Sequence, residues 1–224
     1  MAVLVTGVSS GIGRAIAEKL IGDGRRVVGV SRRDPSLPGC EWVSADLSSA
    51  SELGAVAADV AGRGDLDAVV HAAGVQFSAP LGKLDHEDGA RMWALHVDAP
   101  SRLVDAVVGG LPDGARIVLI GSRTATGVAG KSQYSATKAA LIGLTRSWAM
   151  ELAPRRITVN VVAPGPTATA MLQDPNRSAT PPRVPALGRF VEPSEVAGLT
   201  AFLLGPDGGS ITGQHLVICG GASL

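Results

Sequence analysis

Residues 3–13 read VLVTGVSSGIG. A short β-branched run comes first, a turn containing three glycines follows, and apolar positions then recur at Ile16 and Leu20 with helical spacing. This order predicts a buried strand that turns tightly into a helix. Glycines at such a junction let backbone N–H groups approach a phosphate at the helix N-terminus, where the helix dipole favours negative charge. We therefore predict a dinucleotide-binding turn formed by Gly7, Ser9, Ser10, Gly11, Ile12 and Gly13.

Short apolar runs alternate with longer alanine- and leucine-rich stretches along the rest of the chain. This alternation is typical of repeated βα units around a parallel sheet. The expected strands are almost wholly apolar, as strands covered on both faces should be, and they comprise residues 3–6, 26–31, 41–44, 67–71, 116–122, 158–163 and 215–218. The predicted class is α/β: one Rossmann-type domain over residues 1–224, with a doubly wound parallel sheet of about seven strands.

Local signals refine this outline. Ser49 and Glu52 have the spacing of a capping box, and Pro193 suits the first turn of a late helix. Residues 164–185 contain six prolines and little periodicity, which indicates a loop rather than a domain linker, because strand and helix patterns resume after it. We expect a substrate loop at about residues 166–190.

Composition excludes several classes of protein. The 20 basic and 20 acidic residues among 224 cancel, so neither nucleic acid nor an anionic membrane is an expected partner. No apolar run is long enough to span a membrane, and no leader pattern precedes the first strand; we expect a cytoplasmic protein. Cys40 and Cys219 lack any metal-binding context, so we predict two free thiols and no metal site. The chain has a single tyrosine, Tyr134.

The residues after the second strand bear on which dinucleotide is bound. The strand ends Val30-Ser31-Arg32-Arg33, and no acid occurs before Asp34. An arginine at this position favours NADP, because a guanidinium matches the geometry of a 2′-phosphate. Two alternatives stay open: solvated surface arginines, or an NAD site in which Asp34 turns back to the ribose.

Tyr134 and Lys138 lie four residues apart in a helical pattern that runs from Ser132 to about Ala153, so they share one helix face. A nearby ammonium lowers the pKa of a phenol and makes proton transfer feasible near neutral pH. Ser122, twelve residues before Tyr134, follows a strand at the sheet edge where α/β proteins bind ligands. A hydroxyl there can donate a hydrogen bond to a substrate oxygen.

Together these motifs make the sequence resemble the short-chain dehydrogenase/reductase family, and 3-oxoacyl-carrier-protein reductase-like members within it. The resemblance covers essentially the whole chain. Residues 6–13 (TGVSSGIG) match the family's glycine turn, residues 134–138 (YSATK) its YxxxK motif, and residues 164–165 its PG motif. The resemblance implies homo-oligomers, tetramers or dimers, with the helix from Ser132 as an interface. It also implies that the cofactor is bound by Asp46, Leu47, Ala73, Gly74, Tyr134, Lys138, Pro164, Gly165, Thr167 and Thr169.

Three positions depart from the family pattern. The NNAG motif reads His71-Ala72-Ala73-Gly74, so both asparagines are missing. The catalytic asparagine aligns with His96, which either substitutes for it or is a core histidine without a catalytic part. Ser122 lies twelve residues before Tyr134, where thirteen is commoner.

The leading prediction is an oxidoreductase that transfers a hydride between NADP(H) and a ketone or secondary alcohol, a small molecule. Its predicted catalytic residues are Ser122, Tyr134, Lys138 and, as a candidate, His96. The alternatives are an NAD-dependent dehydrogenase of the same family and a catalytically impaired dinucleotide-binding regulatory protein. The substrate loop contains Arg177, Arg183 and Arg189 against Asp174, which fits either an anionic substrate, such as an acyl thioester carrier or a carboxylate, or plain solvated arginines.

Overall fold

The computed structural model describes residues 1–173 and 181–224. One parallel sheet of seven strands organises the described chain, in the order β3-β2-β1-β4-β5-β6-β7. Its strands are β1 (Ala2–Thr6), β2 (Arg26–Ser31), β3 (Cys40–Ser44), β4 (Leu66–His71), β5 (Arg116–Ile120), β6 (Thr158–Pro164) and β7 (His215–Ile218). The predicted fold class is confirmed.

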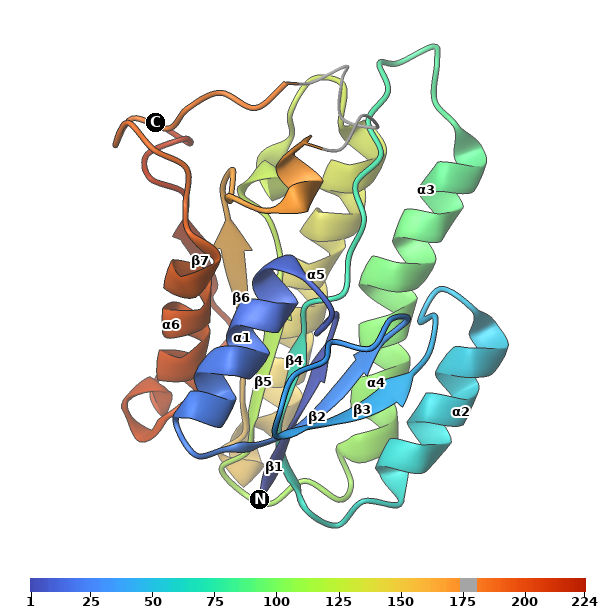
Figure 1. The fold of residues 1–224 in the computed structure, drawn as a ribbon, viewed down its shortest axis with the longest axis vertical. Helices are drawn as coiled ribbons and strands as arrows, with labels where there is room; N and C mark the ends of the chain where they lie inside the picture. Colours follow the sequence, from blue (N-terminus) through green and yellow to red (C-terminus); the bar gives the residue numbers. More distant parts are fainter. Residues whose placement is uncertain (174–180) are drawn as a thin grey trace.

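Helices cover both faces of the sheet (Figure 1). On one face, α1 (Gly11–Gly22) packs beside α6 (Pro193–Leu204) over Val3, Val5 and Val118. On the other face, α2 (Ala50–Ala61), α4 (Ala99–Val107) and α5 (Ser132–Leu152) cover a second apolar layer. An α3 helix (His86–Trp93) leads into a π-helical turn at Ala94–Asp98 and then into α4. The strands are apolar because both faces are buried.

The predicted strand limits are correct to within one or two residues. The largest difference is at β5, which pairs with β6 only as far as Ile120. Ser122 therefore lies in the loop beyond the strand, where it begins a 3-10 turn at Arg123–Thr126. The backbone bends there because Ser122 Oγ accepts a hydrogen bond from the Thr124 N–H, at 3.2 Å.

The helix-start predictions differ in outcome. Pro193 begins α6 as predicted, and the reciprocal capping box forms there between Glu192 and Glu195. The capping box predicted at Ser49 is only half formed. Ser49 Oγ accepts from Glu52 N–H, but the Glu52 carboxylate accepts from the Asp46 N–H at 2.8 Å, because the chain bends back toward it after β3.

The sheet order reverses between β1 and β4, since the chain proceeds outward from β1 to β3 and then crosses to β4. Ligands of open α/β sheets bind at the carboxyl ends of the strands beside such a reversal. Among the described residues no helix is both long and apolar enough to cross a membrane.

Candidate active site

The glycine turn joins β1 to α1 as predicted. Gly7 has a φ of 78°, a conformation that residues with a Cβ rarely adopt. A Cβ on Gly13 would lie 2.4 Å from the carbonyl oxygen of Gly7, which is too close for any side chain. The N-cap residue Ser10 makes no side-chain capping bond within the described chain. The first N–H groups of α1 therefore remain available to an anionic ligand.

A groove of about 210 Å³ lies at the carboxyl ends of β1, β2 and β4. The residues predicted for the nucleotide half of the cofactor come together here. The groove is lined by Gly7, Ser9, Ser10, Gly11, Ile12, Gly13, Arg32, Asp46, Leu47, Ala73, Gly74 and Thr169. The donor set, backbone N–H groups beside an arginine, fits an anionic dinucleotide.

Charged side chains at one end of the groove bear on the choice of dinucleotide. Arg32 Nη1 lies 3.7 Å from Asp46 Oδ2, and the Arg32 side chain is 57% exposed. Burial raises the pKa of Asp46, but hydrogen bonds from Ser48 and the positive charges of Arg32 and Arg91 bring it below its usual value. Asp34 does not line the groove, because its carboxylate accepts the Ser36 N–H at 2.7 Å.

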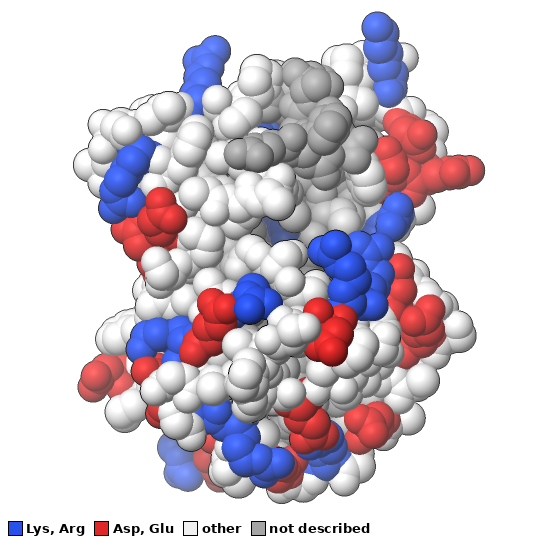
Figure 2. Space-filling model, in the orientation of Figure 1, with Lys and Arg blue, Asp and Glu red and all other residues white. Residues whose placement is uncertain are grey.

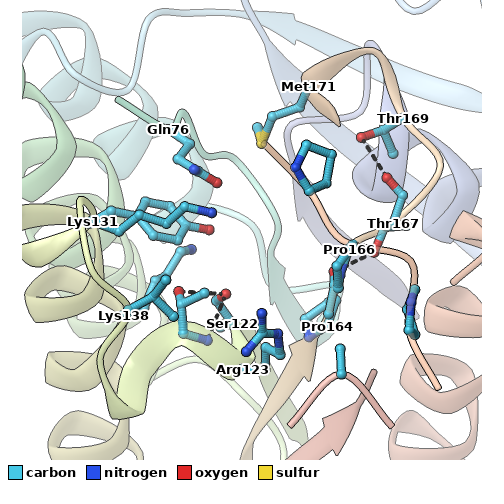
Figure 3. Close-up of a pocket in the computed structure, with 18 of the residues that line it drawn as sticks. Gln76, Ser122, Arg123, Lys131, Lys138, Pro164, Pro166, Thr167, Thr169 and Met171 are labelled. Carbon is cyan, nitrogen blue, oxygen red and sulfur yellow. Dashed lines mark hydrogen bonds between the residues drawn. The ribbon is translucent and has the colours of Figure 1, made fainter. Parts of the chain in front are cut away.

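Ser122, Tyr134 and Lys138 line one cavity of about 760 Å³, a volume typical of small-molecule sites. Their exposed fractions are 7%, 8% and 4%. Figure 3 shows Ser122 and Lys138 on one side of this cavity and Pro164, Thr167 and Thr169 on the opposite side. Gly74, His96 and Gly165 also line it.

Lys138 lies on α5, one helical turn after Tyr134. Its Nζ donates a hydrogen bond to the Ile120 carbonyl at 2.8 Å and lies 5.9 Å from the centre of the Tyr134 ring. Burial lowers the pKa of Lys138 to about 7, because an ammonium loses hydration away from solvent. The one-turn spacing of Tyr134 and Lys138 thus directs both side chains into the same volume, as predicted.

Ser122 is held by its neighbour. Its Oγ lies 2.9 Å from Thr124 Oγ1 and accepts the Thr124 N–H, and Thr124 also lines the cavity. A serine hydroxyl has one hydrogen to donate. With the backbone N–H occupying an acceptor position, that hydrogen is directed either to Thr124 or to a ligand in the cavity.

The family can now be assigned. A family model described as enoyl-(acyl carrier protein) reductase matches residues 7–223. The chain belongs to the short-chain dehydrogenase/reductase family. It is accordingly an NAD(P)-dependent oxidoreductase of the type that acts on CH–OH and C=O groups.

Curated relatives and solved structures cover nearly the full chain. The 3-oxoacyl-[acyl-carrier-protein] reductase FabG of Vibrio cholerae is 35% identical, over 97% of this chain and 95% of that protein. The cyclic-di-GMP-binding biofilm dispersal mediator protein of Escherichia coli is 34% identical, with the same coverage. A blue fluorescent protein from a metagenomic library, solved in complex with NADPH, is 33% identical with a TM-score of 0.88, over 100% of this chain and 98% of that one.

His96, at the position of the family's asparagine, is fully buried in the π-helical turn. Its Nε2 accepts the Val75 N–H at 3.1 Å, and its Nδ1 lies 2.9 Å from Thr137 Oγ1. Burial, with the charge of Lys138, lowers the pKa of His96 well below its ordinary value. The ring is therefore neutral, with its hydrogen on Nδ1. Both nitrogens are engaged within the chain, so the geometry favours a positioning role over one that holds a water molecule.

Thr6 and His71 make the hydrogen bonds that tie residues 71–74 to their neighbours, at the segment where the family pattern has two asparagines. Thr6 Oγ1 accepts the Ala72 and Ala73 N–H groups, each at 3.0 Å, and lies 3.0 Å from His71 Nδ1. His71 Nε2 lies 3.0 Å from the Leu95 carbonyl. Burial lowers the pKa of His71 to about 3, so this ring is neutral and links β1, β4 and the π-helical turn.

Described residues on both sides of the gap in the predicted substrate loop, among them Pro166, Met171 and Pro182, line the cavity. Thr167 pairs with Val191 in an isolated parallel bridge, and Arg183 lines the cavity. Arg189 does not, because both of its Nη atoms contact the Glu195 carboxylate, at 2.7 and 2.9 Å. Asp174 and Arg177 lie outside the described residues.

The structure adds residues that the sequence motifs did not single out. We call the cavity that contains Tyr134 the catalytic cavity and the groove at the glycine turn the nucleotide groove. The catalytic cavity is also lined by Gln76, Arg123, Thr124 and Lys131, and the nucleotide groove by Arg91. The positions of Arg123 and Thr124, directly after Ser122, and of Lys131, one turn before Tyr134, offered a signal. No local signal distinguished Gln76 or Arg91 from surface residues.

Proposed function

We propose that the protein interconverts a ketone and a secondary alcohol, with NADP(H) as the hydride carrier. The observation that carries this proposal is the meeting of Ser122, Tyr134 and Lys138 in one cavity that is continuous with the nucleotide groove. Residues that line both spaces include Ile12, Gly74 and Thr169. A carbonyl carbon at the junction can therefore face a cofactor that extends along the groove.

In the proposed reaction, the bound nicotinamide supplies or accepts the hydride. Tyr134 Oη donates a proton to the carbonyl oxygen during reduction and accepts one from the alcohol during oxidation. Ser122 Oγ donates a hydrogen bond to the same oxygen as negative charge develops on it. Lys138, in its charged form, favours the phenolate and so eases proton loss from Tyr134.

The residues proposed to hold the cofactor contact four parts of it. The N–H groups at Gly11 to Gly13 bind the pyrophosphate. The adenosine end is enclosed by Asp46, Leu47, Ala73 and Gly74. Lys138 holds the nicotinamide ribose, and the nicotinamide end is enclosed by Pro164, Gly165, Thr167 and Thr169. These assignments are supported by the position of each residue in the groove or the cavity.

NADP is favoured over NAD by two observations. Arg32 lines the groove where a 2′-phosphate would lie, and Asp34, the nearest acid in sequence, is engaged in its own turn. The similarity to a protein solved with NADPH supports the same choice.

We further propose that His96 positions Tyr134. His96 Nδ1–H donates to Thr137 Oγ1, whose hydroxyl donates to the Tyr134 carbonyl at 2.9 Å. The His96 and Tyr134 rings also meet edge to face, with centres 5.6 Å apart. The neutral imidazole thus fixes the start of α5 from two directions.

A non-catalytic, dinucleotide-binding regulatory role is the second candidate, since one relative bears a cyclic-di-GMP-binding name. The convergence of Ser122, Tyr134 and Lys138 argues against it, because groove binding alone needs none of them.

We also propose that residues 1–224 work as one domain, with its substrate loop at about 166–190, and that the protein is a cytoplasmic homo-oligomer. The exposed Met150 on α5 supports α5 as an interface.

The test of catalysis is Tyr134→Phe, which removes only the hydroxyl. We expect kcat to fall by about 10²- to 10⁴-fold on any ketone that the native protein reduces, while titration shows that NADPH still binds. Tyr134 is the only tyrosine, so the change removes every phenol. Undiminished turnover would refute the assignment, and tight cofactor binding with no turnover by the native protein across a ketone panel would favour the regulatory role.

A further inference from the structure

The catalytic cavity has a one-sided charge. Arg123, Lys131, Lys138 and Arg183 line it, whereas no Asp or Glu does so among the described residues. The whole chain has equal numbers of acidic and basic residues. Figure 2 shows both signs interspersed on the lower part of the surface, whereas blue and no red is visible in the recess of the upper part. The positive lining is therefore a local property of this cavity, and it favours an anionic occupant.

Two buried polar side chains face the reacting groups. Lys131 directly precedes α5 and is 8% exposed, and Gln76, in the segment after β4, is 6% exposed. Figure 3 shows both pointing into the cavity. Lys131 is the N-cap residue of α5, its carbonyl accepts the Ser135 N–H at 2.7 Å, and its side chain lines the same cavity as that of Tyr134. Gln76 uses one amide N–H to donate to Ser78 Oγ at 3.1 Å, so a second N–H remains to donate.

Arg123 adds a further positive charge beside Ser122. It follows Ser122 and lines the same cavity, and its buried Nε has no hydrogen-bond partner among the described residues. Because this Nε is closed off from the cavity, a ligand there would meet the positive charge of the guanidinium rather than the Nε–H.

We infer that the substrate is a short oxo acid, a ketone that also carries a carboxylate. This inference rests on the proposed ketone reduction and specifies its substrate class. The carboxylate pairs with the Lys131 ammonium and accepts a hydrogen bond from the Gln76 amide, and Arg123 contributes a second positive charge. The ketone oxygen then lies between Ser122 and Tyr134. Because Lys131 and Tyr134 are only three residues apart at the start of α5 and line the same cavity, we expect only a short carbon chain between the carboxylate and the carbonyl.

A set of probes with the same ketone isolates the carboxylate. Acetoacetate, methyl acetoacetate and the N-acetylcysteamine thioester of acetoacetate differ only in the group that would meet Lys131. We expect kcat/KM with NADPH to be at least about tenfold higher for the acid than for the ester, since a charge-assisted pair is worth more than a neutral one. Equal or better turnover of the ester or the thioester would overturn the inference, and a thioester preference would point to a carrier-bound substrate.

Lys131→Met tests the residue directly, because it keeps a long flexible side chain and removes the charge. We expect kcat/KM to fall about 10- to 100-fold for acetoacetate and less than about threefold for the ester. Lys83→Met is the matched control, since Lys83 is exposed and lies outside the cavity lining. Gln76→Leu should lower the acid-to-ester ratio as well, which keeps the test decisive if Lys131→Met does not fold. A uniform loss on both probes would mean that these residues support the fold only.

Binding separates this inference from the proposed function. Calorimetric titration of the NADP-loaded protein with acetoacetate and with its methyl ester needs no turnover. Tighter binding of the acid, weakened by Lys131→Met, would support the anion site even if neither compound were reduced, in which case the ketone reductase proposal would fail alone. Equal binding of acid and ester would overturn the anion site whatever the turnover.

Discussion

The nucleotide groove and the catalytic cavity meet at the same sheet edge but are built from different parts of the chain. The groove depends mainly on backbone, through its three glycines and the uncapped start of α1, together with the exposed side chain of Arg32 at one end. The cavity depends on side chains that are almost fully buried: Ser122, Tyr134, Lys138 and His96. Where backbone atoms pack as closely as at Gly13, an added side chain clashes with them. Buried polar groups such as Lys138 instead lower the stability of the folded protein, because they lose hydration.

The largest effect is expected in the backbone site. Gly13→Ala places a methyl group 2.4 Å from the Gly7 carbonyl oxygen, and we expect it to lower the free energy of unfolding by about 3 kcal/mol or more and to abolish cofactor binding. Gly22→Ala in the same helix is the control, because the new Cβ would have no described heavy atom within 4 Å other than those of its chain neighbours and of the adjacent helix backbone. That change should raise stability by up to about 1 kcal/mol. Urea titration measures both, and equal effects would contradict the backbone account.

In the cavity, Lys138→Met should raise stability while it lowers activity, whereas Gly13→Ala lowers stability. We expect kcat to fall by about 10²- to 10⁴-fold, while the free energy of unfolding rises by a few kcal/mol at pH 7 or below, because a buried ammonium is replaced by an apolar chain of similar length. A loss of both activity and stability would show that Lys138 supports the fold.

The pH dependence of that stability difference has a definite sign. The pKa of Lys138 is lowered to about 7 from an ordinary value of 10.5, so between these values the unfolded chain binds more protons than the folded one. The stability of the native protein should therefore rise with pH across this window relative to Lys138→Met. Urea titrations of both proteins at pH 6, 8 and 10 measure it, and parallel curves would contradict the shift.

A smaller effect is expected at Arg32. Arg32→Ala should weaken NADPH binding by about 10- to 100-fold and leave NADH binding nearly unchanged, because only NADPH has the 2′-phosphate. Fluorescence titration with both cofactors measures the ratio of their affinities, with Arg146→Ala as the control, because Arg146 is exposed and lies outside the groove lining. A native preference for NADH would refute the assignment of NADP.

The smallest effect is expected at His96. His96→Asn can still donate to Thr137 or accept from Val75, but it reaches less far, so we expect kcat to fall by about 3- to 10-fold with KM unchanged. His96→Leu, which makes neither bond, should lose more. Since His96 is neutral at ordinary pH, neither variant should shift the pH profile of kcat, and a shift of that profile would show that His96 itself exchanges protons.

Much of this architecture was readable from the sequence because it depends on local geometry. The glycine turn follows from what a Cβ at Gly13 would meet within the turn itself, and the pairing of Tyr134 with Lys138 follows from the helical period. The partners of His71 and His96 could not be predicted. His71 meets Thr6 across 65 residues, and His96 meets Thr137 across 41, so these bonds exist only once the sheet is assembled.

The same division applies to the whole protein. Strand alternation, glycine positions and helical spacing are properties of neighbouring residues, so the sequence alone predicted the parallel α/β fold, a dinucleotide-binding turn and the candidate catalytic residues Ser122, Tyr134 and Lys138. That both ring nitrogens of His96 are engaged, and that Gln76, Arg123 and Lys131 share the cavity with Tyr134, depends on how distant segments pack together. The burial of a side chain and the charges around it depend on segments that are far apart in the chain, so a local sequence pattern cannot predict them.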